Sequence, residues 1–531
     1  MSVCHSLIHA RPELEERFLY VRSHWNKTSA QLQFIERVWR ELSAEHLAIQ
    51  EETLIVLVTK LQSSTKKIDG LIKPGLKNEK NDQADVKRWK YVFVKRYLDD
   101  AIKTLRKWQA IYDPSWWLIL RIAAPFVDTA LKQRLPCDSE HDEGSAVLQK
   151  ARRLRRTITG DYSQNEHIFL PGSGLDNQKV ICISRSSAEC LIRTDRNGVS
   201  KHLIVDTVSC LAGSSAEMLK RDVKSLARRL QQVDPVAFGL LKCRGVVDLN
   251  TCFKMVFETP SKNPPRTLRS CLEAQTTHTL TERMEVACRL AKAVAHIHTL
   301  DFVHKSICPE NLVGFEGESS NLGSFYLVGF EQVRVTEGAT YRHGDIDWEK
   351  NLYRHPSRQG LLPMQKYSLQ HDIYSLGVCL LEIGLWETFV LYDERDRVKA
   401  PNASLLGLPT EKLATKRPNE IKDLLVELAT RKLPLMVGEL YAEVVVNCLT
   451  CLDSDNVDFA DNDDSEGQDG IAVGICYLQK VCSSSWNVQE NPAHRHLGPA
   501  QIRQDRGVEA VPLFTVMTKE TEFQCSRNSG C

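Results

Sequence analysis

The sequence predicts an α+β protein in which an N-terminal all-α helical bundle precedes a unit of mixed structure. Residues 12–120 carry apolar stripes at helical spacing, and residues 179–208 contain two short runs typical of strands. Residues 281–298 form an amphipathic helical pattern that leads directly into a polar loop. The chain has 531 residues, which is enough for two or three domains.

The first predicted domain, residues 1–127, is defined by helical periodicity. Its apolar side chains recur every three or four residues in four successive patterns. They are Leu14, Phe18, Val21 and Trp25; Leu32, Ile35, Val38, Trp39 and Leu42; Leu47, Leu54, Leu57, Val58 and Leu61; and Trp89, Val92, Leu98, Ile102, Leu105 and Trp108. Asp113 and Pro114 then suit the cap and first position of a further helix. Antiparallel helices around a shared core are the simplest way to bury these stripes.

A polar loop follows the helical pattern that ends at residue 298. Residues 304–311 read His-Lys-Ser-Ile-Cys-Pro-Glu-Asn. This octapeptide resembles the catalytic loop of protein kinases, H-R-D-L-K-P-E-N. Gly329-Phe330-Glu331 then stands where kinases have D-F-G, residues 353–357 resemble Y-R-A-P-E, and residues 372–377 resemble D-x-W-S-x-G.

This resemblance implies a bilobal kinase-like fold, with a small lobe over residues 176–260 and a large lobe over residues 261–482. The retained residues His304, Phe330 and Asp372 are expected to be structural. In protein kinases the equivalent of Asp372 is a buried carboxylate that accepts backbone N–H groups of the catalytic loop. We therefore assign these three residues to the scaffold and not to the chemistry.

The departures from the kinase pattern fall on the reacting groups. In protein kinases an aspartate accepts the substrate proton, a lysine two residues later steadies the γ-phosphate, and an asparagine holds magnesium. Ser306, Cys308 and Asn311 occupy these positions, and Gly329 replaces the metal-binding aspartate. A serine hydroxyl is a poor base near neutral pH, and cysteine carries no positive charge. The sequence therefore predicts a catalytically impaired domain.

The small lobe departs from the pattern as well. Asp206 stands at the position of the phosphate-pairing lysine, so a negative charge is expected to face the phosphates and repel ATP. Asp222 stands nearest to the glutamate that would pair with that lysine, and no ion pair can form between two carboxylates. The turn over residues 184–188 has no glycine to let backbone N–H groups approach a phosphate. Glu258 marks the hinge, whose backbone could bind an adenine-like ring.

The order of a helical bundle and a degenerate kinase-like unit, together with Asp113-Pro114-Ser115-Trp116-Trp117, resembles a group of fungal proteins. These proteins carry a HeLo-type (prion-inhibition and propagation) domain fused to a kinase-like domain. The resemblance covers roughly the first nine tenths of the chain and implies a role in incompatibility or cell-death signalling. Members usually open with a hydrophobic, glycine-rich helix, which the opening residues 1–5 do not resemble.

Composition narrows the classes of partner. The net charge of +1 gives no electrostatic attraction to nucleic acid. There is no secretory signal and no apolar run of about 18 residues, so we expect a cytoplasmic protein with reduced thiols at its 17 cysteines and no metal site.

Residues 128–175 are interpreted as a linker whose basic cluster, residues 150–156, is a solvated helix face. Residues 483–531 lose all periodicity and are predicted to be a disordered tail.

Three functional hypotheses follow. The leading one is a pseudokinase that acts as a scaffold or signal-relay module for a protein partner and needs no cofactor. The enzyme alternative is an atypical kinase that uses ATP and magnesium, with Glu331 or Asp345 holding the metal, and phosphorylates protein Ser or Thr. The third is a helical module that associates peripherally with membranes and forms homo-oligomers.

Overall fold

The computed structural model describes residues 10–41, 125–132, 143–159 and 168–175, and most of residues 178–456. The longest gap within the last range covers residues 336–346, and residues 99, 102 and 116 are described singly. The helical patterns over residues 47–61 and, apart from those single positions, 89–108 lie outside the described residues. So do the cap at Asp113, the alternative metal ligand Asp345 and the predicted tail over residues 483–531.

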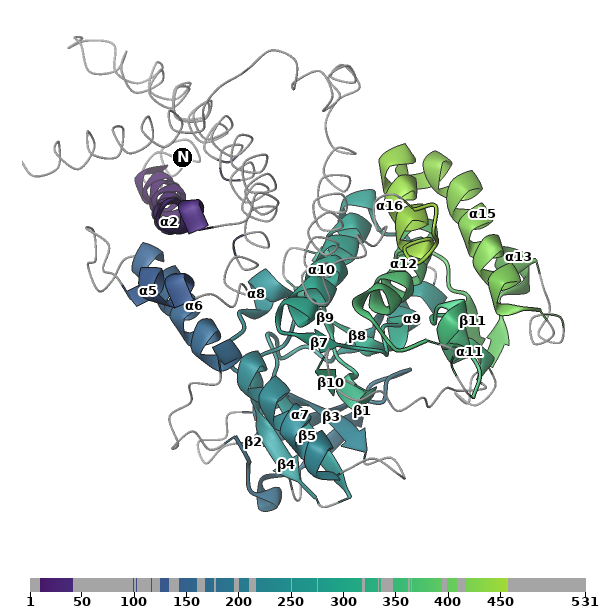
Figure 1. Ribbon diagram of the computed structural model, residues 1–531, viewed down its shortest axis with the longest axis horizontal. Coiled ribbons are helices and arrows are strands. Elements are labelled where there is room, and N and C mark those ends of the chain that lie inside the picture. The colour runs from purple at the N-terminus through teal and green to yellow at the C-terminus, as the bar shows by residue number, and fades with distance from the viewer. Residues whose placement is uncertain are drawn as a thin grey trace, which may run out of the picture.

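Three N-terminal helices pack against one another: α2 (Ala10–Val38), α5 (Pro125–Lys132) and α6 (Glu143–Thr159) (Figure 1). The short 3-10 helix η1 (Trp39–Glu41) continues α2. Phe34 and Ile35 are buried, and the ring of Phe34 lies edge-on to Trp116 with centroids 6.0 Å apart. The first predicted stripe and the Leu32, Ile35 and Val38 positions of the second thus lie on α2, and Trp39 lies on η1. A complete bundle over residues 1–127 stays a prediction, because most of residues 42–124 are not described.

The interpretation of residues 128–175 as a linker is wrong for much of its length. Helix α6 lies in this range, and its Arg155, only 3% exposed, donates to Asp128 of α5 at 2.8 Å. Lys150 pairs at 3.0 Å with Asp234 of the following unit. The backbone N–H of Leu170 donates to Val246 O at 2.7 Å, so the chain here runs along a strand of the small lobe. The basic cluster therefore joins elements, which its sequence alone could not show because both acidic partners are distant in the chain.

The small lobe is a five-stranded antiparallel sheet with one long helix. Its strands are β1 (Lys179–Cys182), β2 (Glu189–Thr194), β3 (Ser200–Ser209), β4 (Cys243–Asp248) and β5 (Cys252–Glu258), in the spatial order β1-β2-β3-β5-β4. Helix α7 (Ala216–Leu230) connects β3 to β4 and packs on the sheet through Val223, Leu226 and Leu230. The short α8 (Pro235–Phe238) leads into β4 and is capped by the side chain of Asp234.

The large lobe is mainly helical. Its helices are α9 (Leu268–Glu273), α10 (Leu280–Thr299), α11 (Trp348–Asn351), α12 (Leu369–Leu385), α13 (Ala403–Leu406), α15 (Pro418–Val437) and α16 (Glu439–Leu449). Its strands are β6 (Arg266–Thr267), β7 (Phe302–Val303), β8 (Leu312–Gly317), β9 (Ser320–Leu327), β10 (Arg334–Val335), β11 (Val390–Tyr392) and β12 (Lys399–Pro401). Short 3-10 turns are η4 (Pro309–Asn311), η5 (Phe330–Gln332) and η6 (Pro356–Arg358).

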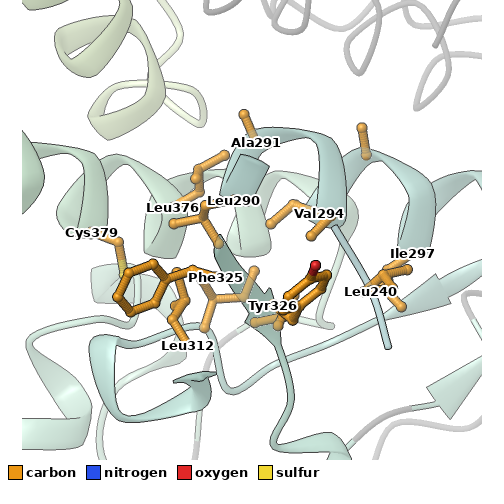
Figure 2. Packing of buried hydrophobic residues seen from close by; sticks show 14 of the residues in the cluster. Leu240, Leu290, Ala291, Val294, Ile297, Leu312, Phe325, Tyr326, Leu376 and Cys379 are labelled. Atoms are coloured by element: carbon orange, nitrogen blue, oxygen red, sulfur yellow. The ribbon is translucent and has the colours of Figure 1, made fainter. Parts of the chain in front are cut away.

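Helix α10 is the centre of this lobe. Thr279 caps its first turn and Glu282 reaches back to the backbone of Thr279, which forms a capping box. Its apolar face meets β9 on one side and α12 on another. Figure 2 shows Leu290 and Val294 of α10 above Phe325 and Tyr326 of β9. This packing fixes the point at which α10 ends and the loop resembling a catalytic loop begins.

Candidate functional site

The loop after β7 is held by the buried carboxylate of Asp372, in the first turn of α12. Asp372 Oδ2 accepts the N–H of His304 at 2.7 Å, and Oδ1 accepts the N–H of Lys305 at 2.9 Å. The hydroxyl of Tyr367 donates to Oδ1 at 2.7 Å, and His298 Nε2 lies 3.0 Å from Oδ2. Lys305 has a φ of 68°, a left-handed conformation that costs a non-glycine residue free energy. The structure therefore places Asp372 beneath the loop as its anchor.

Phe330 links this loop to the small lobe through ring contacts. Its ring centroid lies 5.1 Å from that of His304 and 5.8 Å from that of Phe257 on β5. All three side chains are fully buried. Burial lowers the pKa of His304 to about 4, so its imidazole is neutral near pH 7. His304 and Phe330 thus serve as packing groups between the two lobes.

Ser306 and Cys308 stand where protein kinases have the catalytic base and the lysine that steadies the γ-phosphate. The hydroxyl of Ser306 donates to Glu331 Oε1 at 3.4 Å, which is a long contact. Burial raises the pKa of the Cys308 thiol well above its ordinary value, so the thiol stays protonated and uncharged. Neither group offers a strong base or a positive charge to a phosphate.

The two positions that hold magnesium in protein kinases are packed into each other. Gly329 has a φ of 84°, and an ideal Cβ on its backbone would lie 2.2 Å from Cγ of Asn311. The Asn311 amide is 7% exposed, and its Nδ2 donates to Ser306 O at 2.7 Å. The Asn311 amide therefore fills the space that a side chain at position 329 would need.

Asp206 does not face a phosphate site, which corrects the expectation from its position in the sequence. Its carboxylate is 1% exposed, and Oδ2 accepts the N–H groups of Gly329 at 2.9 Å and Phe330 at 2.6 Å. The strand β3 is thereby tied to the turn η5. Burial is the main cause that raises the pKa of Asp206, to about 6, against the lowering effect of these two hydrogen bonds.

We expect Asp206→Asn to flatten the pH dependence of stability between about pH 4 and pH 6. Because the pKa of Asp206 is higher in the folded than in the unfolded chain, its proton stabilises the folded state in acid, and this contribution is lost as pH rises through about 6. The shift corresponds to about 3 kcal/mol. Asparagine keeps an oxygen for both N–H donors, so the variant should match or exceed the parent in free energy of unfolding at pH 7.5. Urea titrations at pH 4, 5, 6 and 7.5 measure it, and an equal loss at every pH would contradict it.

The other two predicted small-lobe positions lie outside the cavity described below. Asp222 is a buried residue of α7, with Arg221 Nε 3.7 Å from its Oδ1. Glu258 ends β5 with an exposed side chain, and its backbone N–H donates to Lys242 O at 3.0 Å. This N–H is engaged within the protein, and the binding of an adenine-like ring by the hinge backbone stays a prediction.

A cavity of about 700 Å³ opens beside the loop. It is bounded by the β1–β2 turn (residues 182–187), the loop over residues 305–311 and the segment over residues 349–354. Serine hydroxyls and side chains of both charges line it, including Ser306 and Glu331. The cavity therefore joins polar groups of both lobes.

A buried ionic network beneath the cavity was missed by sequence reasoning. Arg269 of α9 is fully buried and donates to Glu310 at 3.0 and 3.2 Å, to Glu382 at 2.8 Å and to the Tyr353 hydroxyl at 2.5 Å. The Tyr353 hydroxyl in turn donates to Glu382 at 2.7 Å. One signal was available, because Glu382 interrupts the apolar run of α12, and a charge in such a run needs a partner.

No protein-family model matches the chain. A curated protein that it resembles is the serine/threonine-protein kinase VRK3 of Homo sapiens, with 31% identity over 130 residues. The match covers 22% of this chain and 25% of the human protein, so the chain spans about a quarter of that relative's length.

This similarity indicates a kinase-like domain. It is weak and partial, and the mixed α+β architecture is consistent with it. It gives no information about a HeLo-type domain.

Among the helices whose placement is described, none combines the length and the apolar character needed to cross a membrane. Within the same parts of the chain, no group of three or more His, Cys, Asp or Glu side chains could hold a metal ion.

Proposed function

We propose that the chain is a kinase-like protein without phosphotransfer activity, and that its kinase-like domain serves as a scaffold or signal-relay module for a protein partner. The contact between Gly329 and Asn311 supports this most directly. In protein kinases an aspartate and an asparagine hold the magnesium ions that neutralise the charge developing on the transferred phosphoryl group. Here one ligand is absent and the amide of the other is packed into its place.

The electrostatics of the small lobe support the same proposal. Asp206 stands where protein kinases have a lysine, and its carboxylate accepts the backbone N–H groups of Gly329 and Phe330. Two polar contacts of the framework are kept, in contrast, since Asp372 anchors the loop and Arg269 joins α9 to α12. A fold that keeps these two buried anchors while its reacting groups are replaced suits binding better than catalysis.

Restoring the missing aspartate should not restore metal binding. Gly329→Asp requires a left-handed backbone at an L residue and a Cβ 2.2 Å from Asn311, so we expect a loss of about 3 kcal/mol in the free energy of unfolding. Thermal shift with ATP and magnesium, beside ATP with a chelator, should show no metal-dependent rise in Tm for the parent or the variant. Gly360→Asp is a matched control, because Gly360 also has positive φ but open space around its Cβ. A metal-dependent rise in Tm of the parent would contradict the proposed function.

An active kinase is the second candidate, and the contact of Ser306 with Glu331 favours it. The Glu331 carboxylate lines the same cavity and lies next to the position of the missing base, where it could accept a proton or hold a metal ion. If phosphate transfer from ATP to a protein Ser or Thr is found, Glu331→Gln should abolish it. Transfer that survives this substitution would remove the structural basis of the second candidate.

The fungal resemblance extends the proposal to the N-terminal helices. On that basis the kinase-like domain would control a HeLo-type bundle in incompatibility or cell-death signalling, either in the cytoplasm or at a membrane surface. The ion pair between Lys150 of α6 and Asp234 of the small lobe is a direct connection between the two parts. Flotation of the full chain with anionic liposomes separates membrane association from a purely cytoplasmic relay, and sedimentation tests homo-oligomer formation.

A further inference from the structure

The β1–β2 turn is fastened to the large lobe by side chains of the protein itself. Arg185 Nε lies 2.9 Å from Glu273 Oε2 at the end of α9, and both side chains are less than a fifth exposed. The Arg185 guanidinium also stacks on the ring of Tyr392, 4.5 Å from its centroid. The hydroxyl of Thr267 donates to Ser184 O at 2.9 Å. We call these five residues the clasp.

The large-lobe half of the clasp is preorganised. Glu273 uses its second oxygen, Oε1, to accept the N–H of Tyr392 at 3.0 Å. The Tyr392 hydroxyl donates to Glu310 Oε1 at 2.8 Å, and Glu310 is bound by the buried Arg269. Arg185 therefore meets a carboxylate and a ring that are already fixed, so little side-chain entropy is lost when the contact forms.

The backbone of Arg185 is strained in a way that its side chain offsets. Its φ is 65°, in the left-handed region that favours glycine. A non-glycine residue there costs of order 1 kcal/mol and persists where other contacts compensate. In protein kinases this turn is glycine-rich and closes over the phosphates of the nucleotide. Here Arg185 adopts the glycine-like conformation, and its side chain reaches Glu273 and Tyr392 of the large lobe.

We infer that the clasp holds the two lobes closed without a nucleotide, because side chains of this chain make the contacts between lobes that a bound nucleotide makes in protein kinases. Closure of kinase loops normally follows ligand binding. In this protein it is built into the sequence, and the tie from Asp206 to Gly329 and Phe330 acts in the same direction. The turn is then a permanent part of the surface that a partner meets.

Hydrogen–deuterium exchange of the full chain without nucleotide tests this inference. The N–H of Ser186 donates to Ile183 O at 3.1 Å, so peptides over residues 183–190 report whether the turn stays closed. We expect Glu273→Ala and Arg185→Gly each to speed exchange there by about tenfold or more, since each removes a partly buried charge-assisted hydrogen bond. The matched control is Glu316→Ala, which removes the pair with Arg266 at 3.0 Å within the large lobe and should leave this peptide unchanged.

The double variant Arg185→Gly with Glu273→Ala should exchange no faster than about the faster single variant, because both substitutions break one contact. Three outcomes would overturn the inference: exchange of the turn in the parent at the rate of an unstructured peptide, an equal effect of Glu316→Ala, or additive effects in the double variant. The parent measurement needs no variant to fold. Nucleotide binding is measured separately. The exchange result can therefore contradict the clasp without affecting the proposed absence of phosphotransfer, and a finding of phosphotransfer would leave the clasp untouched.

Discussion

Arg269→Leu is expected to reduce the free energy of unfolding by about 3–5 kcal/mol, the largest effect of any single substitution considered. The guanidinium is fully buried and is the cation that faces both Glu310 and Glu382. Its removal leaves two carboxylates inside the protein with no positive charge to offset their desolvation. Burial already raises the pKa of Glu382 in the intact network, so without Arg269 this carboxyl should take up a proton near neutral pH. Chemical unfolding at pH 7.5 measures the loss.

Two controls separate buried charge from lost packing. Arg431→Leu removes a guanidinium 2.7 Å from Glu427 on the exposed face of α15, where the side chain is 76% exposed, and should change stability by less than about 0.5 kcal/mol. The triple variant Arg269→Leu, Glu310→Leu and Glu382→Leu should recover much of the loss, because it removes the isolated charges together. A triple variant that is less stable than Arg269→Leu would contradict this explanation. It would show that the hydrogen bonds of the network stabilise the fold by more than the unpaired charges destabilise it.

Asp372→Ala is expected to cost about 3 kcal/mol or more and to loosen the loop over residues 304–311. The carboxylate accepts two backbone N–H groups and the Tyr367 hydroxyl, and alanine leaves all of these donors buried without an acceptor. The positive φ of Lys305 would then lose the backbone hydrogen bond that helps to offset its cost. Unfolding titrations measure the loss of stability. Hydrogen–deuterium exchange should become faster in the loop over residues 304–311 and change less in α10.

The pH dependence of this anchor has the opposite sign to that of Asp206. Burial alone would raise the pKa of Asp372, but the hydrogen bond from His298, the nearby histidine charges and the Tyr367 hydroxyl lower it to about 2. Its stabilising contribution of about 2 kcal/mol is therefore complete above pH 4 and is lost as pH falls toward 2. The Asp372→Ala variant should lack this acid-dependent component. If parent and variant lose stability in parallel from pH 4 to pH 2, the carboxylate is not the group responsible.

The parts of the fold that the sequence predicted well depend on local periodicity. The helix expected over residues 281–298 is α10 (Leu280–Thr299), and residues 216–230, whose apolar side chains also recur at helical spacing, form α7 (Ala216–Leu230). Both present an apolar face every three or four residues and bury it. The loop over residues 304–311 could be located because its residues are consecutive and leave a readable motif.

The contacts that decide the site join residues far apart in the chain, and no local pattern reports them. Arg269 and Glu382 are 113 positions apart, and Arg185 and Glu273 are 88 apart. The position of Asp206 on β3 was readable, but the direction of its carboxylate depends on the turn at Gly329, 123 residues later. The linker interpretation failed for the same reason, since Arg155 finds its partner on a different helix. Long-range pairing of charges is the information that composition and periodicity omit.

The fit of Asn311 against Gly329 has an evolutionary consequence. A lineage with this arrangement cannot recover a metal-binding aspartate by one replacement, because the new Cβ would collide with the amide of Asn311. Moving that amide first would break its bond to Ser306 and surrender the other magnesium ligand. Each order of reversal passes through an intermediate that is less stable and still lacks a complete pair of metal-binding side chains. Under the proposed function, selection for a folded protein would then oppose the return of a metal site.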